Sequence, residues 1–255
     1  MSPDGYLHPK LAVALLLGLL TGVLPGCSQG SDGAVANRVT GECVVLLHGL
    51  ARSSLSMELM QESLEANGFR VANIDYPSRD YPIEELAPMA VGAGIEQCQD
   101  GGDTQAIHFV THSLGGILVR FYFAGNELDE LGRVVMLGPP NQGSNAADAM
   151  RDVPGFDWLN GPAGYQLGKG EESIPRRLGP PDFEFAVIAG NRSIDPVTSR
   201  VLDDPDDGRV SVADTRLEGM RDFRVVAVSH AFIMQEAEVF SLVRNFLVHG
   251  SFDGP

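Results

Sequence analysis

The sequence predicts one α/β domain with a mostly parallel central sheet and helices on both faces. Short, continuous apolar runs, typical of strands buried on both sides, alternate along the chain with segments of helical spacing. That alternation favours parallel strands joined by crossover helices. The chain has 255 residues, of which 44% are hydrophobic and 20% charged, so it can bury one substantial core.

Apolar spacing defines the first strands and helices. Val44–Leu47 is an unbroken apolar run bounded by turn residues, which predicts a buried strand. Ser56–Asn67 has apolar residues at helical spacing and is followed by Gly68, a residue type that often ends helices. Phe69–Tyr76 is predicted as the next strand, and a helix is predicted over about Ile83–Gln99.

Two more strands are predicted in the middle of the chain. One begins at Ile107, turns sharply at residues 111–115 and continues as an apolar helix, and the other is Arg133–Leu137. Residues 141–182 are rich in Gly and Pro, with little periodicity beyond a short helix near Ala146–Arg151. Because this segment is too long for an ordinary connection, we expect a functional insertion.

The last part of the chain completes the alternation. Phe183–Ala189 and Phe223–Val228 are the remaining predicted strands, and an acidic turn, Asp203–Gly208, lies between them. Glu236–Val248 closes the chain as an amphipathic helix. No internal repeat and no second domain are predicted.

The net charge of −16 argues against some partners. Asp4 and Lys10 cancel within residues 1–26, so the acidity belongs to the remainder of the chain. Nucleic-acid binding needs a basic surface, so no nucleic-acid partner is expected. No histidine or cysteine cluster has metal-ligand spacing, so no metal ion is predicted.

The N-terminus resembles an export signal. Leu11–Leu24 is almost wholly apolar but short for a membrane span, which favours a signal peptide over residues 1–26. The run ends in Leu-Pro-Gly-Cys27-Ser, which resembles the bacterial lipoprotein processing site. Under that interpretation Cys27 is lipidated, residues 27–42 are a flexible tether, and the lipid is the only membrane contact. We therefore expect an exported protein, either an envelope lipoprotein or a periplasmic or secreted one.

The other two cysteines, Cys43 and Cys98, form an even pair in a chain that is expected to be exported. Cys43 opens one strand and Cys98 closes a helix that precedes another strand. A disulfide between them is one interpretation. Two buried thiols that never meet are the alternative.

Ser113 stands where a strand passes directly into a helix. A serine hydroxyl is a weak nucleophile and must project to where both a base and an acyl carbonyl reach it, which a tight turn achieves. Such a turn favours small residues two before and two after the serine. Gly115 meets this demand, whereas Thr111 stands where the pattern G-x-S-x-G has glycine. The alternative is that Ser113 only caps the helix.

Backbone N–H groups near the ends of two strands are candidates for stabilising an oxyanion. His48-Gly49-Leu50 follows the first predicted strand at its carboxyl end, where α/β sheets bind ligands. Leu114 follows the candidate nucleophile. We therefore assign the N–H groups of Leu50 and Leu114 to an oxyanion hole, although a plain strand-ending turn also explains His48-Gly49.

His230 is the candidate base because it follows the last predicted strand directly. The acid is expected between Ser113 and His230 in the chain, and the acidic turn there favours Asp207, with Asp206 as the alternative. A solvated turn and a calcium loop also fit this acidic stretch. Pro205 occupies the third ligand position of such a loop, which argues against calcium.

Together these motifs resemble the bacterial lipase/esterase branch of the α/β-hydrolase superfamily. The resemblance spans residues 43–248 and includes His48-Gly49, Thr-His-Ser113-Leu-Gly-Gly, Gly138-Pro-Pro-Asn-Gln-Gly143-Ser144, Asp207-Gly208 and His230. It implies an α/β-hydrolase fold over residues 43–250, with Ser113 as nucleophile, His230 as base and Asp207 as acid. Segment 141–182 then takes the place of the family's cap or lid. Its apolar residues are expected to form an acyl-binding wall: Phe156, Trp158, Leu159, Tyr165 and Leu167.

The activity implied is hydrolysis of carboxylic esters or lipids through an acyl-enzyme, without a cofactor. Phospholipase, thioesterase, amidase and acyltransferase activities use the same residues and stay open. The alternative of another class is a non-catalytic, envelope-anchored binding protein on a hydrolase fold.

Overall fold

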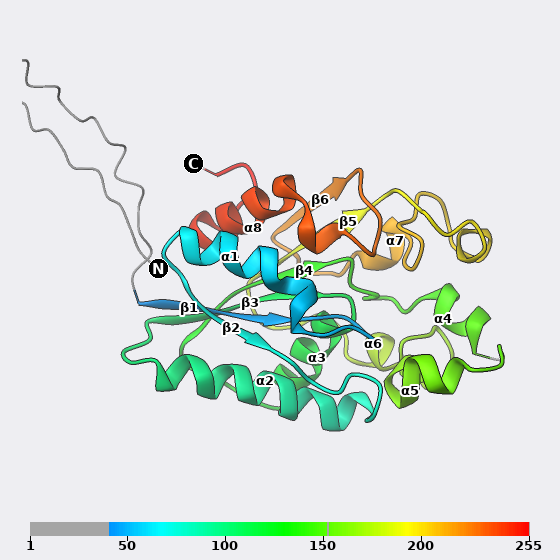
Figure 1. The fold of residues 1–255 in the computed structure, drawn as a ribbon, viewed down its shortest axis with the longest axis horizontal. Helices are drawn as coiled ribbons and strands as arrows, with labels where there is room; N and C mark the ends of the chain where they lie inside the picture. The colour runs from blue at the N-terminus through cyan, green and yellow to red at the C-terminus, as the bar shows by residue number, and fades with distance from the viewer. Residues whose placement is uncertain (1–40, 152, 255) are drawn as a thin grey trace, which may run out of the picture. The chain divides into compact units, whose positions relative to one another are not determined.

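The computed structural model describes residues 41–151 and 153–254. Six parallel strands form one sheet in the order β2-β1-β3-β4-β5-β6 (Figure 1). The predicted α/β fold is confirmed, and the strands lie where the apolar runs predicted them. The strands are β1 (Glu42–Leu47), β2 (Arg70–Ile74), β3 (Ala106–His112), β4 (Leu131–Leu137), β5 (Phe185–Gly190) and β6 (Asp222–Val226).

Helices cover both faces of this sheet (Figure 1). Helices α1 (Glu58–Ala66) and α8 (Ala237–His249) pack on one face, and α2 (Ile83–Asp100) and α3 (Leu114–Phe123) pack on the other. Side chains alternate along β1, so Val44 faces the α1 and α8 side and Val45 faces α2 and α3. Burial on both faces explains why the strands appear in the sequence as continuous apolar runs.

The insertion between β4 and β5 is more regular than expected. It contains α4 (Asn145–Met150), which was predicted, and also α5 (Phe156–Gln166) and α6 (Ile174–Arg177), which were not. Gly161 has φ 59° and ψ −167° and interrupts α5, and a Cβ there would lie against the backbone of Arg79. Glycine and proline inside these short helices hide their periodicity, so the prediction of an irregular segment was wrong.

Short helical turns occupy the remaining loops. They are the 3₁₀ turns η1 (Ser54–Met57), η2 (Thr198–Val201) and η3 (Ile233–Gln235), and the helix α7 (Val212–Thr215). Of the helices that the structure describes, none is both long and apolar enough to cross a membrane.

Arg120 joins the insertion to the core. Its side chain is 2% exposed on α3, and Nη1 donates to the backbone and side-chain oxygens of Asn141 at 3.2 and 3.0 Å. Nη2 donates to the backbone oxygens of Pro175 and Gly179 at 2.9 and 2.8 Å. Burial lowers the pKa of Arg120 to about 10. One guanidinium thus holds both ends of the insertion against the helix that follows Ser113.

Cys43 and Cys98 are joined in a disulfide, with their Cα atoms 5.8 Å apart and a sequence separation of 55. Both residues are buried. The bond links the start of β1 to the end of α2, at the amino-terminal edge of the sheet. The predicted signal peptide, Cys27 and most of the predicted tether lie outside the described residues.

Candidate active site

Ser113 is the single residue between β3 and α3. Its φ of 52° and ψ of −115° lie in a region that residues with a side chain rarely adopt. The side chain makes no capping hydrogen bond to α3, so helix capping does not explain the serine. The turn leaves the hydroxyl at the carboxyl edge of the sheet, where Ser113 lines a cavity.

Close packing of this turn against β1 explains the glycine two positions after the serine. A Cβ at Gly115 would lie 2.7 Å from the backbone oxygen of Leu47 and 3.1 Å from that of His48, which is too close for a carbon atom. Thr111 is fully buried in β3, with its Oγ1 3.5 Å from the backbone oxygen of Val135. The turn therefore requires glycine two positions after the serine and accommodates threonine two positions before it.

Asp207 and His230 are in direct contact. Nδ1 of His230 lies 2.7 Å from Oδ2 of Asp207, and the backbone N–H of His230 donates to the backbone oxygen of Asp207 at 2.9 Å. The other carboxylate oxygen of Asp207 accepts from the N–H groups of Arg209 and Val210. A carboxylate only accepts hydrogen bonds, so Nδ1 carries the proton and Nε2 is left as an acceptor.

Asp206, the alternative acid, has a different role. Its Oδ1 accepts from the Ser199 hydroxyl at 2.8 Å and from the Gly208 N–H at 2.6 Å. These bonds stabilise the turn that presents Asp207 to the imidazole. Of the two neighbouring carboxylates, Asp207 is the one that contacts His230.

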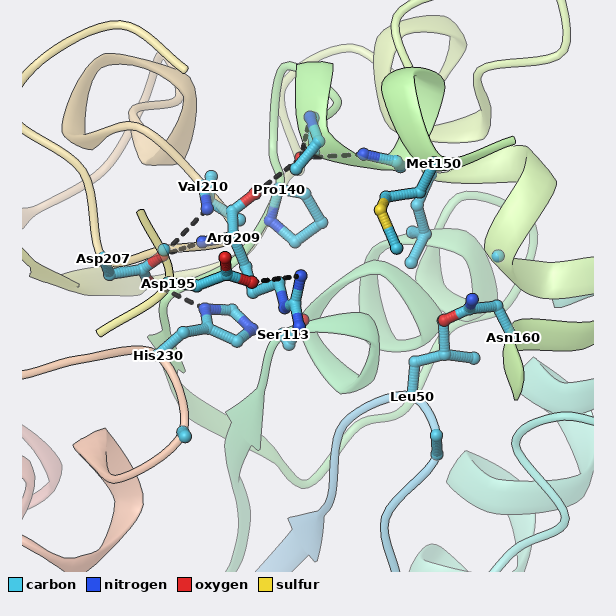
Figure 2. A pocket seen from close by; sticks show the side chains of 18 of the residues that line it. Leu50, Ser113, Pro140, Met150, Asn160, Asp195, Asp207, Arg209, Val210 and His230 are labelled. Carbon is cyan, nitrogen blue, oxygen red and sulfur yellow. Dashed lines mark hydrogen bonds and ion pairs between the residues drawn. The ribbon is translucent and has the colours of Figure 1, made fainter. Parts of the chain in front are cut away.

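Ser113, Asp207 and His230 line one cavity of about 820 Å³. Figure 2 shows the imidazole of His230 between the carboxylate of Asp207 and the side chain of Ser113. It also shows Leu50 and Met150 across the cavity from Asp195 and Arg209. Leu50 and Met150 therefore form an apolar side of the cavity opposite these charged residues. Ala146, Ala147 and Leu167 add further apolar surface to the lining.

The N–H groups of Leu50 and Leu114 have no acceptor among the described residues. Leu114 is the first residue of α3, where the N–H has no intrahelical partner, and Leu50 lies just beyond the neighbouring strand β1. A Cβ at Gly49 would lie 3.3 Å from the Cβ of Ser113, so the loop holding Leu50 passes close to the serine. Both N–H groups are therefore free to donate to a ligand, and the oxyanion hole assigned to them stays a prediction.

Comparison with known proteins decides the family. A model of the alpha/beta hydrolase family matches residues 44–244. This chain belongs to that family. No curated protein sequence matches the hydrolase significantly.

Solved structures of bacterial lipolytic enzymes share the fold of the hydrolase. Mature Bacillus licheniformis lipase BlEst2 has a TM-score of 0.66 and 22% identity, over 83% of this chain and 92% of that one. The Legionella pneumophila phospholipase PlaB has a TM-score of 0.58 and 20% sequence identity, over 69% of this chain and 45% of that one. The metagenomic carboxyl esterase MGS0156 has a TM-score of 0.58 and 18% sequence identity, over 76% of this chain and 66% of that one.

His112 contacts the loop that carries His230, a role the sequence did not predict. Its Nε2 lies 3.0 Å from the backbone oxygen of His230, and the two rings are 4.7 Å apart between centroids. Burial holds the pKa of His112 well below its usual value of 6.5, and the nearby His230 and Arg52 lower it further. His112 is therefore a neutral donor that fixes the backbone of the candidate base.

The expected acyl wall of the hydrolase needs correction. Leu167 lines the cavity, but Trp158 is 77% exposed and Tyr165 is not among the lining residues. The side chains of Phe156 and Leu159 lie outside the described part of the chain. The apolar side comes mainly from small and flexible residues of α4, which have no aromatic signal in the sequence.

Proposed function

We propose that this hydrolase is a serine carboxylester hydrolase in which Ser113, His230 and Asp207 form a catalytic triad. The observation that supports this most directly is the 2.7 Å contact between His230 and Asp207 at a cavity that Ser113 also lines. The unfavourable backbone of Ser113 supports a functional role, because such strain is common at active sites.

In the proposed reaction, Nε2 of His230 takes the proton of Ser113 as the serine oxygen bonds to the ester carbonyl carbon. Asp207 stabilises the imidazolium, and the Leu50 and Leu114 N–H groups bind the oxyanion. When the tetrahedral intermediate collapses, the bond between the carbonyl carbon and the leaving alkoxide breaks, and the alkoxide takes the proton from His230. Water then repeats these steps on the acyl-enzyme and releases the acid.

Proton transfer in this mechanism needs a rearrangement of the site. The structure shows no hydrogen bond between the hydroxyl of Ser113 and the other described residues, so Oγ and Nε2 of His230 must approach each other before the proton is transferred. Such contacts often tighten only when substrate binds. The acyl group of the substrate would lie against Leu50, Met150 and Leu167.

Labelling with a fluorophosphonate probe tests the nucleophile. Ser113→Ala should abolish labelling and hydrolysis of p-nitrophenyl esters. Ser144 is a matched control, because it lines the same cavity but caps α4 and donates to the backbone oxygen of Arg209. Ser144→Ala should retain labelling. Labelling that survives in Ser113→Ala contradicts the proposal, and a folded wild type without any hydrolase activity favours the binding-protein alternative.

The lipase and carboxyl esterase among the structural neighbours support carboxylic esters as substrates, and the phospholipase supports testing phospholipids. A panel should therefore compare p-nitrophenyl esters of increasing chain length with a phospholipid, a thioester and an amide. Carboxylic esters are expected to give the highest kcat/KM. A faster reaction with a thioester or an amide would contradict the assignment.

We also propose that the protein is exported and that Cys27 becomes its lipidated N-terminus. The apolar run Leu11–Leu24 and a disulfide between Cys43 and Cys98 support an oxidising compartment. Mass spectrometry of the mature protein should show a diacylglyceryl group on Cys27. An uncleaved leader or an unmodified Cys27 would contradict the proposal.

A further inference from the structure

Arg52 lies in the loop after β1 and lines the cavity. Three contacts fix this loop. The backbone N–H of Arg52 donates to the backbone oxygen of Gly49 at 3.3 Å, and the N–H of Ala51 donates to the Ser78 hydroxyl at 3.1 Å. Nη2 of Arg52 donates to the backbone oxygen of Ala231 at 3.2 Å. The guanidinium is thus held in place before any ligand arrives.

The other charged side chains of the cavity have close side-chain partners. Nη1 of Arg209 lies 3.4 Å from a carboxylate oxygen of Asp195, and Asp207 contacts His230. Arg52 has no carboxylate partner among the described residues. It is therefore the cavity cation whose charge is not balanced by a neighbouring side chain.

An unbalanced cation is notable in this chain, which has 18 basic and 34 acidic residues. Burial lowers the pKa of Arg52, which means that the surroundings disfavour its charged form. Apart from the bond to Ala231, its guanidinium N–H groups have no acceptor among the described residues. A bound anion would supply acceptors and offset the cost of desolvation.

The position of Arg52 indicates which part of a substrate it meets. Ala231, its hydrogen-bond partner, directly follows His230. In the proposed reaction His230 gives its proton to the leaving alcohol, so the alcohol part lies on this side of the cavity. We propose that Arg52 binds an anionic group, phosphate or carboxylate, on the alcohol part of the ester substrate. The inference rests on the proposed function and specifies its substrate class.

A purely structural role is the competing explanation. The bond from Arg52 to Ala231 also ties the loop after β1 to the loop that carries His230. If this were its whole role, loss of the guanidinium would impair neutral and anionic esters equally. The ratio between two matched esters therefore separates the explanations.

Binding to the Ser113→Ala variant tests the proposal without turnover. The probes are 1-hexanoylglycerol and 1-hexanoylglycerol 3-phosphate, which differ only in the phosphate, and hexanoyl glycolate as the carboxylate arm. Calorimetry should give a Kd for the phosphate ester roughly tenfold to a hundredfold lower than for the neutral ester, as expected for a charge-assisted hydrogen bond. Tighter binding of the glycolate ester instead would identify a carboxylate as the anion.

Variants at Arg52 assign the preference to the guanidinium. Adding Arg52→Gln should remove the preference, and Arg52→Lys should keep part of it because the charge remains. Arg244 is exposed on α8, so Arg244→Gln makes the same change in net charge away from the cavity and should keep the preference. The proposal is overturned if the Ser113→Ala variant binds the anionic esters no more tightly than the neutral ester. It is also overturned if the Ser113→Ala, Arg52→Gln double variant keeps the preference for the anionic esters.

Turnover by the protein with Ser113 intact then separates this inference from the proposed function. Arg52→Gln should lower kcat/KM for the phosphate ester much more than for the neutral ester. Equal losses on both esters would overturn the anion site and support the structural role. Absence of turnover with every ester would count against the proposed function, while the binding experiment would still decide the role of Arg52.

Discussion

Nε2 of His112 lies 3.0 Å from the backbone oxygen of His230, so the residue before the serine holds the loop that carries the imidazole. The two residues are 118 positions apart in the sequence. The candidate nucleophile and base are therefore connected through a backbone hydrogen bond as well as through the cavity between them.

Loss of this hydrogen bond should reduce kcat. His112→Ala leaves the backbone oxygen of His230 without its donor, and we expect kcat for p-nitrophenyl butyrate to fall roughly tenfold, with a small change in KM, since about 1–3 kcal/mol is at stake. His112→Asn retains an N–H donor and should recover part of the loss. Equal kinetics for His112→Ala and wild type, with both folded, would show that the contact does not position the base.

Stability should decrease in mild acid. Burial lowers the pKa of His48 and of His112 below the usual 6.5, so in this range the unfolded chain binds more protons than the folded one. The stability that these residues contribute is complete above about pH 6.5 and is lost as the pH falls towards their folded-state pKa values.

Urea unfolding between pH 5 and 8 measures this effect. Each histidine should contribute a slope of at most about 1.4 kcal/mol per pH unit below pH 6.5. His112→Asn should reduce the slope without removing it, because His48 remains. An unchanged slope in that variant would mean that His112 is protonated in the folded protein.

Gly115 and Thr111 should respond oppositely to substitution. Gly115→Ala places a Cβ 2.7 Å from the backbone oxygen of Leu47, so the turn must shift, and we expect most ester hydrolysis to be lost. Thr111→Gly restores the pattern G-x-S-x-G and should keep activity, while a glycine inside a strand lowers stability by roughly 1 kcal/mol. Thermal melting and initial rates of both variants test this, and full activity in Gly115→Ala would contradict the geometry of the turn.

Removal of the disulfide should affect stability but not catalysis. Cys43 and Cys98 close a loop of 55 positions, for which chain entropy predicts about 4 kcal/mol of stabilisation. The Cys43→Ala, Cys98→Ala double variant should melt earlier than wild type and keep its kcat at 20 °C, because the bond lies at the sheet edge away from Ser113. Dithiothreitol should lower the melting temperature of wild type alone. If dithiothreitol lowers the melting temperature of neither the wild type nor the double variant, the cysteines are not bonded in the isolated protein.

The parts of the fold that follow from short-range patterns were predicted from the sequence. Strands buried on both faces have continuous apolar runs, and all six predicted strands are present. The position of Ser113 between a strand and a helix, and that of His230 just after the last strand, also follow from local order. Chain order restricted the acid to the acidic turn, but the choice between Asp206 and Asp207 needed coordinates, because neighbouring residues point in different directions.

Contacts between distant residues were not predictable in this way. Arg52 meets Ala231 across 179 positions, and no local pattern distinguishes it from a solvent-exposed arginine. Helices α5 and α6 of the insertion were missed because Gly161 and Pro175 suggest loops. Trp158 illustrates the converse error, since an aromatic residue in an apolar context was expected in the cavity wall and is exposed instead.

The four oxygens gathered around Arg120 have a consequence for protein engineering. Because Asn141, Pro175 and Gly179 meet at one guanidinium, the segment between them begins and ends at a single fixed point. A foreign loop of different length could be grafted between those residues without altering how strands β4 and β5 pair in the sheet. Substrate range in this scaffold can therefore diversify by loop exchange, provided that the arginine and its oxygen acceptors are kept.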